Sequence, residues 1–230
     1  MKYLKPLSNA GLTSLLTLLT CSALAHNISD SNAQFVEGVE GAAIAPFLYL
    51  GAKHMVTGYD HLLFLVGVVF FLYRLRDVVI YVTLFTLGHS ATLLLGVLGG
   101  LNVNAYLIDA IIGLSVVYKA FENMGGFRRL MGVNPNTKVA VGIFGLFHGL
   151  GLATKIQEFE LSDNGLIANI ISFNLGVEIG QMLALSAILL LLFRWRQSQH
   201  FNKHAFLANS VLMTGGFLLT GYQLVGFWLY

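Results

Sequence analysis

Six long apolar stretches, separated by short polar connections, constrain the fold of this chain more than any other feature. A bilayer core about 30 Å thick is crossed by about 20 helical residues, so such stretches are typical of membrane spans. Hydrophobic residues make up 56% of the chain and charged residues 10%, with a mean hydropathy of +0.74, which excludes an ordinary soluble domain. The sequence therefore predicts an all-α fold, a polytopic membrane helix bundle, with spans near Gly58–Tyr73, Val78–Leu98, Ala105–Glu122, Val139–Thr154, Leu166–Phe193 and Ala205–Trp228.

The first 25 residues have the pattern of a secretory signal peptide. The basic start consists of Lys2 and Lys5, and the apolar middle is Leu12–Leu19. The small-residue cleavage site is Ala23-Leu24-Ala25. We expect residues 1–25 to be removed and residues 26–230 to form a single six-helix transmembrane domain. An uncleaved anchor and a lipoprotein signal ending at Cys21 are the alternatives, and cleavage would leave His26 as the first residue, with its role as a ligand open.

The positively charged residues fall mainly on one side of the predicted bundle. The connections after the first, third and fifth spans hold Arg74, Arg76, Arg128, Arg129, Lys138, Arg194, Arg196 and Lys203, whereas Lys53 and Lys155 fall on the opposite side. Cytoplasmic connections carry the excess of Lys and Arg in membrane proteins. The count predicts a multi-pass protein of the inner (plasma) membrane with its mature N-terminus outside, in the periplasm. A short interfacial or re-entrant helix is expected over Gly41–Lys53, ahead of the first span.

Two imidazoles and a carboxylate stand where the first span begins, in His54, Asp60 and His61. Positions seven apart on a helix differ by about 20°, so both histidines share a face if the helix runs through Gly58. The simpler interpretation is a helix start, in which Asp60 complements the N-terminus and the histidines are interfacial.

Further polar residues lie inside the other predicted spans. They are His89 in the second span, His148 in the fourth, and Asn174 and Glu178 on one stripe of the fifth. In hydrocarbon such groups face one another or a wet cavity, so we expect them to converge with the first-span residues on one outward-facing polar chamber. Lys119 and Glu122 are expected to form a snorkelling ion pair apart from it.

The residue types indicate which ligand such a chamber would take. Neutral imidazole, carboxylate and amide oxygen suit nickel, cobalt, zinc or manganese and disfavour Cu(I). We therefore predict a divalent metal ion, nickel, cobalt or zinc, held by His54, Asp60, His61, His89, His148, Asn174 and Glu178.

Two motifs resemble the HupE/UreJ family of membrane proteins, particularly its second branch. The family's first-span signature H-P-x-x-G-x-D-H is matched by His54, Gly58, Asp60 and His61, with Met55 in place of the proline, and Phe173–Gln181 resembles a fifth-span block. The fourth span departs from the family pattern F-H-G-x-A-H-G-x-E, because only its second histidine is retained, as His148. The resemblance implies a nickel or cobalt permease, while the departure leaves the identity of the ion open.

The leading hypothesis is a metal-cation permease or metal-binding accessory protein rather than an enzyme. The alternative is an intramembrane zinc-dependent hydrolase acting on lipid, with Asp60 or Glu178 as general base and Ser90 near the site, and a haem-binding subunit ranks last. The expected partners are the metal ion and the lipid bilayer. The chain has no basic run for nucleic acid, and a homo-oligomer stays open.

Overall fold

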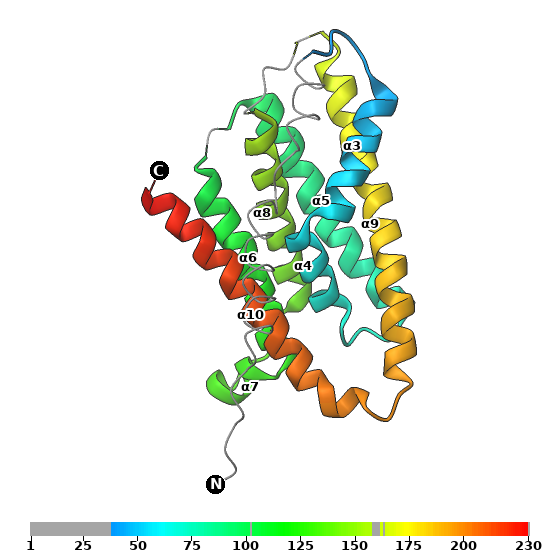
Figure 1. Ribbon diagram of the computed structural model, residues 1–230, viewed down its shortest axis with the longest axis vertical. Helices are drawn as coiled ribbons and strands as arrows, with labels where there is room; N and C mark the ends of the chain where they lie inside the picture. Colours follow the sequence, from blue (N-terminus) through cyan, green and yellow to red (C-terminus); the bar gives the residue numbers. More distant parts are fainter. Residues whose placement is uncertain (1–37, 102, 158–161, 163, 230) are drawn as a thin grey trace, which may run out of the picture.

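The computed structural model describes residues 38–101, 103–157, 162 and 164–229. Within them all regular elements are α-helices, which confirms the all-α prediction. They are α3 (Ile44–Thr57), α4 (Tyr59–Val69), α5 (Leu75–Gly99), α6 (Ala105–Asn123), α7 (Gly126–Met131), α8 (Thr137–Gln157), α9 (Leu166–Arg196) and α10 (Phe201–Leu229), and they form one elongated bundle (Figure 1). The predicted signal peptide and His26 lie outside the described residues.

In the part of the chain that the structure describes, four helices are long and apolar enough to cross a membrane, namely α5, α8, α9 and α10. Helix α6 has 19 residues but also carries Asp109, Lys119 and Glu122. Helices α3 and α4, of 14 and 11 residues, are each too short for a core about 30 Å thick. The protein is therefore a multi-pass membrane protein in which the predicted first span is built differently from the others.

The helix does not run through Gly58, so the condition under which His54 and His61 would share one helix face is not met. Gly58 has φ −71° and ψ 106°, which is extended backbone, so α3 ends and α4 begins there. The peptide groups stay satisfied, because the Gly58 N–H donates to the His54 carbonyl at 2.9 Å and the Gly58 carbonyl accepts from the Leu62 N–H at 3.1 Å. The chain thus contains a discontinuous helix, with the His54 and His61 side chains on either side of the break.

Close glycine contacts pair the helices. Gly176 and Gly180 of α9 lie directly against the α3 backbone, and Gly145 and Gly149 of α8 lie against α5. A Cβ on Gly149 would stand 2.0 Å from the His89 carbonyl oxygen. Small residues that admit such contacts are typical of membrane helix interfaces. Gly142 of α8 also lies close to α5, since a Cβ on Gly88 would stand 2.6 Å from its carbonyl oxygen, whereas a Cβ on Gly142 itself would meet nothing within 4 Å.

Helix α3 packs lengthwise on α9 rather than lying alone at a membrane surface (Figure 1). At its start, the Asn169 side chain accepts from the Ala43 N–H at 2.7 Å and donates to the Gly41 carbonyl at 3.0 Å. These contacts hold the chain before α3 to the start of α9. The expected interfacial or re-entrant segment is therefore part of the bundle.

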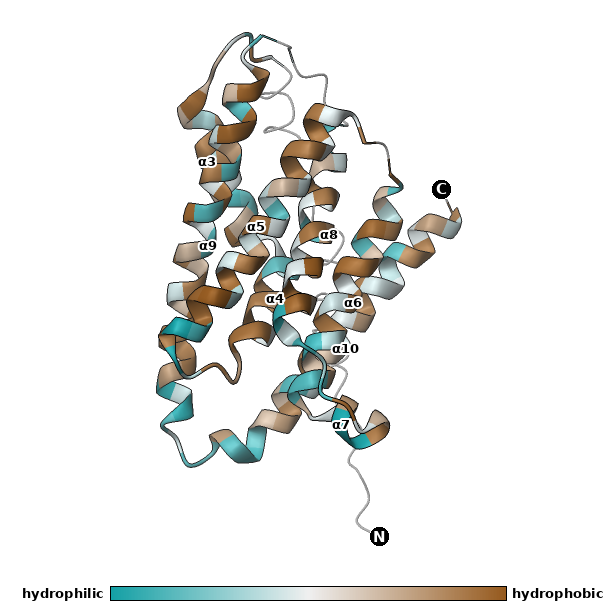
Figure 2. Ribbon diagram, turned by 180° about the vertical axis from the view of Figure 1, so that it is seen from behind, coloured by the Kyte–Doolittle hydropathy of each residue, from teal (hydrophilic) through white to brown (hydrophobic). Residues whose placement is uncertain are grey.

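The basic residues gather at one end of the bundle, as their sequence positions predicted. This basic end consists of the start of α5, helix α7, the start of α8, and the α9–α10 connection, where Figure 2 shows hydrophilic residues in teal. The Arg196 guanidinium donates there to the carbonyls of Val69, Phe70 and Leu72. It thereby satisfies the carbonyl groups at the end of α4 and anchors this short helix to α9.

Lys119 and Glu122 form the predicted ion pair, with Nζ to Oε2 at 2.7 Å. The expected snorkelling is wrong, however, because Lys119 is only 4% exposed. Its Cβ packs near Gly67 of α4, and Glu122 also accepts a hydrogen bond from Thr137 of α8. The pair joins α6 to α4 and α8 inside the bundle.

Candidate metal centre

His61 lies at the centre of the polar cluster. Its ring centroid is 5.1 Å from that of His54, 4.9 Å from that of His148 and 5.9 Å from that of His89. The four imidazoles come from α3, α4, α5 and α8, which are separated by up to 94 positions in the chain. The predicted convergence of these histidines is therefore present in the fold.

Asp60 and His61 occupy the first turn of α4, directly after the break. The partial positive charge of a helix N-terminus favours a carboxylate at this place. Asp60 is 2% exposed, and its Oδ1 lies 3.1 Å from Nδ1 of His61. Gly58 leaves room for the pair, since a Cβ there would lie 3.0 Å from the His61 ring and 3.1 Å from the Asp60 carboxylate. The break therefore positions a carboxylate and an imidazole together inside the bundle.

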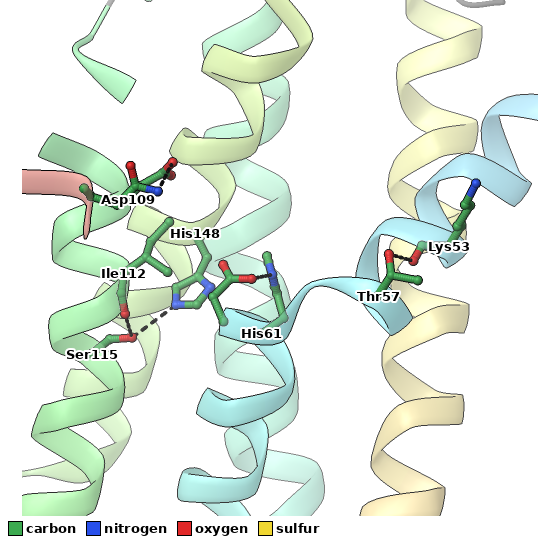
Figure 3. A network of polar contacts seen from close by, with 9 residues as sticks. Lys53, Thr57, His61, Asp109, Ile112, Ser115 and His148 are labelled. Carbon is green, nitrogen blue, oxygen red and sulfur yellow. Dashed lines mark hydrogen bonds and ion pairs between the residues drawn. The ribbon is translucent and has the colours of Figure 1, made fainter. Parts of the chain in front are cut away.

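His148 enters from α8 and is fully buried. Its ring lies 5.1 Å from the ring of Phe64 and 5.1 Å from the ring of Phe85, measured between centroids. Its Nε2 lies 3.2 Å from Oγ of Ser115 on α6, as Figure 3 shows. Ser115 was not among the predicted site residues, because a lone serine on an apolar helix carries no sequence signal of such a contact.

Asp60, His61 and His148 offer donor atoms that all lie within 4.8 Å of one another, and all three residues are buried. Donors about 2.0 to 2.2 Å from a tetrahedral zinc would stand about 3.4 Å apart, so a modest closure would seat a small divalent cation. Two imidazoles and one carboxylate also match the ligands that nickel, cobalt and zinc accept. The donor set therefore fits such an ion, with His89 and the half-buried His54 close to the same group.

Glu178 of α9 is not one of these close donors. Asn174 donates to Oγ of Ser90 on α5 at 3.0 Å. One turn further along, Glu178 is half-buried and lines a groove of about 550 Å³ between α5 and α9, together with Thr83, Thr86, Leu87, Gln181 and Met182. The structure thus separates a closed histidine centre, made of His54, Asp60, His61, His89 and His148, from an open α5–α9 groove.

The histidine centre and the α5–α9 groove are neighbours through α5. His89 faces His61, while Thr86, three residues before His89, donates to Oε1 of Gln181 at 2.9 Å. Gln181 is 2% exposed and Thr86 is half-buried, and both residues line the groove, so this interhelical bond lies in the groove wall. One helix therefore contributes to both polar regions.

Buried His and Asp side chains at a helix break, inside a bundle of apolar helices, define a class of protein. It is a multi-pass membrane protein with a buried group able to hold a divalent cation. Residues 29–230 match the family described as HupE / UreJ protein, so the chain belongs to the HupE/UreJ family, which is associated with nickel and cobalt uptake. Searches of curated proteins and of solved structures found no significant match.

Proposed function

We propose that this protein is a membrane permease, or a metal-binding accessory protein, for a nickel- or cobalt-type divalent cation. One observation carries the proposal, namely the buried group of Asp60, His61 and His148 with donor atoms within 4.8 Å of one another. Burying a carboxylate and two imidazoles inside a membrane bundle costs free energy unless a partner offsets their lost hydration. A bound cation would do so by neutralising the carboxylate. Membership of a family associated with nickel and cobalt uptake supports the same reading.

The proposed topology has six spans after a cleaved signal peptide, residues 1–25. Helices α3 and α4 together have 25 residues and count as one discontinuous span, joined by α5, α6, α8, α9 and α10. The gathering of Arg and Lys at the basic end favours a cytoplasmic location for that end and an outer location for the start of α3. The single transmembrane domain would then extend over residues 26–230 of an inner-membrane protein.

In this scheme the cation is the substrate, captured from outside by the histidine centre. His54 is only half-buried, which makes it the first imidazole that an incoming ion would meet. Asn174 and Glu178 would receive the ion on its way inward, because the α5–α9 groove continues from Glu178 to Leu75 and Leu189 near the basic end. The membrane potential would favour inward movement of a cation.

Uptake measurements test this proposal. Cells that produce His61→Ala or Asp60→Ala protein should accumulate radioactive nickel or cobalt at least ~10-fold more slowly than cells with the unaltered protein, since each change removes a donor. His204→Ala is the matched control, because His204 is exposed at the start of α10, and uptake should stay unchanged. Undiminished uptake in the His61 and Asp60 variants, at equal protein levels, would remove the permease proposal.

The second candidate function is the zinc-dependent hydrolysis of a lipid. It is favoured by the number of close donors, since catalytic zinc centres use three protein ligands and leave one position for water. Because Asp60 is one of these three donors, this reading gives the general base to Glu178, and Ser90 is engaged by Asn174. Stoichiometric zinc in the purified protein, with a lipid-hydrolysing activity that is lost on chelation, would favour the enzyme over the permease.

A further inference from the structure

We infer that Ser115 is a positioning residue that makes His148 present its Nδ1 atom, rather than Nε2, to the cation. The inference rests on the proposed function for the role of the cation. The assignment of the proton on His148 stands independently, because it follows from hydrogen bonds inside the protein.

The first step concerns the single proton of the Ser115 hydroxyl. Oγ of Ser115 lies 2.6 Å from the carbonyl oxygen of Ile112, one turn earlier in α6. Two oxygens at this separation require a hydrogen between them, and the carbonyl has none to give. The Ser115 hydroxyl therefore donates its hydrogen to the Ile112 carbonyl. Toward any other partner the hydroxyl oxygen can only accept a hydrogen bond.

The second step assigns the His148 ring. Nε2 of His148 lies 3.2 Å from the same Ser115 oxygen. Because the Ser115 proton is already used, Nε2 carries a hydrogen and donates it to Oγ. A neutral imidazole has one N–H, so the lone pair of His148 is on Nδ1, and a cation would be bound through that atom. Figure 3 shows Nε2 turned toward Ser115 and the rest of the ring toward His61.

Burial fixes this arrangement. Ser115 and His148 are both fully buried, so water does not compete for Nε2. Phe64 and Phe85 pack near the ring and restrict its rotation about the side chain. A metal-binding histidine commonly donates its second N–H to a protein acceptor, which orients the ring and raises its basicity. Ser115 has the geometry of that acceptor.

His61 is oriented in the opposite sense. Its Nδ1 lies 3.1 Å from the Asp60 carboxylate, which only accepts when ionised, so Nδ1 carries the hydrogen and Nε2 the lone pair. The two closest imidazoles thus present different nitrogen atoms, each selected by its own acceptor. Loss of the Ser115 acceptor removes the selection at His148 and leaves that at His61 intact.

Nitrogen NMR of the full-length protein, labelled with ¹⁵N-histidine and free of metal, tests the assignment directly. At about pH 8, where an ordinary imidazole is neutral, we expect a His148 signal pair with a protonated Nε2 and an unprotonated Nδ1. The pair is identified by its loss in His148→Gln. A protonated Nδ1 on His148 would overturn the inference. Zn²⁺ is then added to the same sample. If the Nε2 proton of His148 is observed but Zn²⁺ shifts no histidine signal, the proton assignment stands and the proposed metal-binding function fails.

Zinc titration of purified variants tests the positioning role. Ser115→Ala should weaken Zn²⁺ binding ~10- to 100-fold, the usual effect of losing an acceptor behind a ligand, whereas Ser115→Thr retains the hydroxyl and should stay within about threefold. The matched control is Ser172→Ala, since Ser172 is also buried and bonds only to its own helix, through the Ala168 carbonyl at 2.7 Å. Equal affinity in Ser115→Ala and the unaltered protein would overturn the role of Ser115.

Discussion

The histidine centre and the α5–α9 groove are both polar regions inside the bundle, yet they are built in opposite ways. The histidine centre is closed, with Asp60, His61 and His148 at most 2% exposed and held by closely packed glycine interfaces. The groove is open to the side, has about 550 Å³ of space and exposes part of Glu178. A closed site rich in nitrogen donors suits retention of a transition metal, whereas an open path with oxygen donors suits passage. Polar residues at similar positions along their helices therefore lie in different surroundings according to which neighbour they face.

The largest expected effect comes from removing two metal-binding side chains of the histidine centre. The double variant His61→Ala/His148→Ala removes both imidazoles of the closest donor group and should weaken equilibrium binding of Ni²⁺ or Co²⁺ more than ~100-fold, since each loss costs at least the ~10-fold effect of losing a supporting residue. Calorimetric titration of purified protein measures it. The double variant His200→Ala/His204→Ala removes two exposed histidines and should bind as before; a parallel loss there would mean that the cation is bound elsewhere.

The packing around the histidine centre gives the next effect. In Gly149→Ala the new methyl group would meet the His89 carbonyl at 2.0 Å, so α8 and α5 must separate. Overpacking of this kind costs about 1–3 kcal/mol, and the thermal unfolding midpoint should fall.

The control for this change is Gly142→Ala on the same helix, where a Cβ meets nothing within 4 Å. Alanine is a better helix former than glycine by about 1 kcal/mol, so this variant should be as stable as the unaltered protein or more so. If both variants unfold at the same temperature, the close approach of α5 and α8 is not what holds the centre together.

Glu178→Gln separates the two regions functionally. Because Glu178 lies in the groove and not in the close donor group, equilibrium metal affinity should change less than about threefold while uptake falls ~10-fold through loss of the charge on the path. Binding by calorimetry and uptake in cells measure the two parts. A large loss of affinity would instead join Glu178 to the histidine centre and erase the distinction.

The smallest expected effect concerns the bond that closes α5 onto α9 beside the groove. Thr86→Val removes the hydroxyl that donates to Gln181 and should lower the free energy of unfolding by about 0.6 kcal/mol, the average for a hydrogen bond between membrane helices. Denaturation in mixed micelles measures it. Thr83→Val, at an exposed position one turn earlier, is the matched control and should leave stability unchanged.

The sequence by itself determined the helical class, the basic end and most members of the centre. Apolar stretches and the bilayer thickness predict helices because unpaired peptide groups are excluded from hydrocarbon. The presence of His54, Asp60, His61, His89 and His148 in or beside apolar spans indicated a shared site. These inferences depend on residue chemistry and position along a helix, which a sequence records directly.

Only the tertiary structure decided which polar residues meet. The sequence gives the position of a side chain along its helix but not the rotation of that helix against its neighbours, so it grouped Glu178 with His148 where the fold separates them. The break at Gly58 and the burial of Lys119 likewise depend on contacts between distant segments. The contact between Ser115 and His148 joins α6 to α8 and depends on the rotation of these two helices against each other, which the sequence does not record.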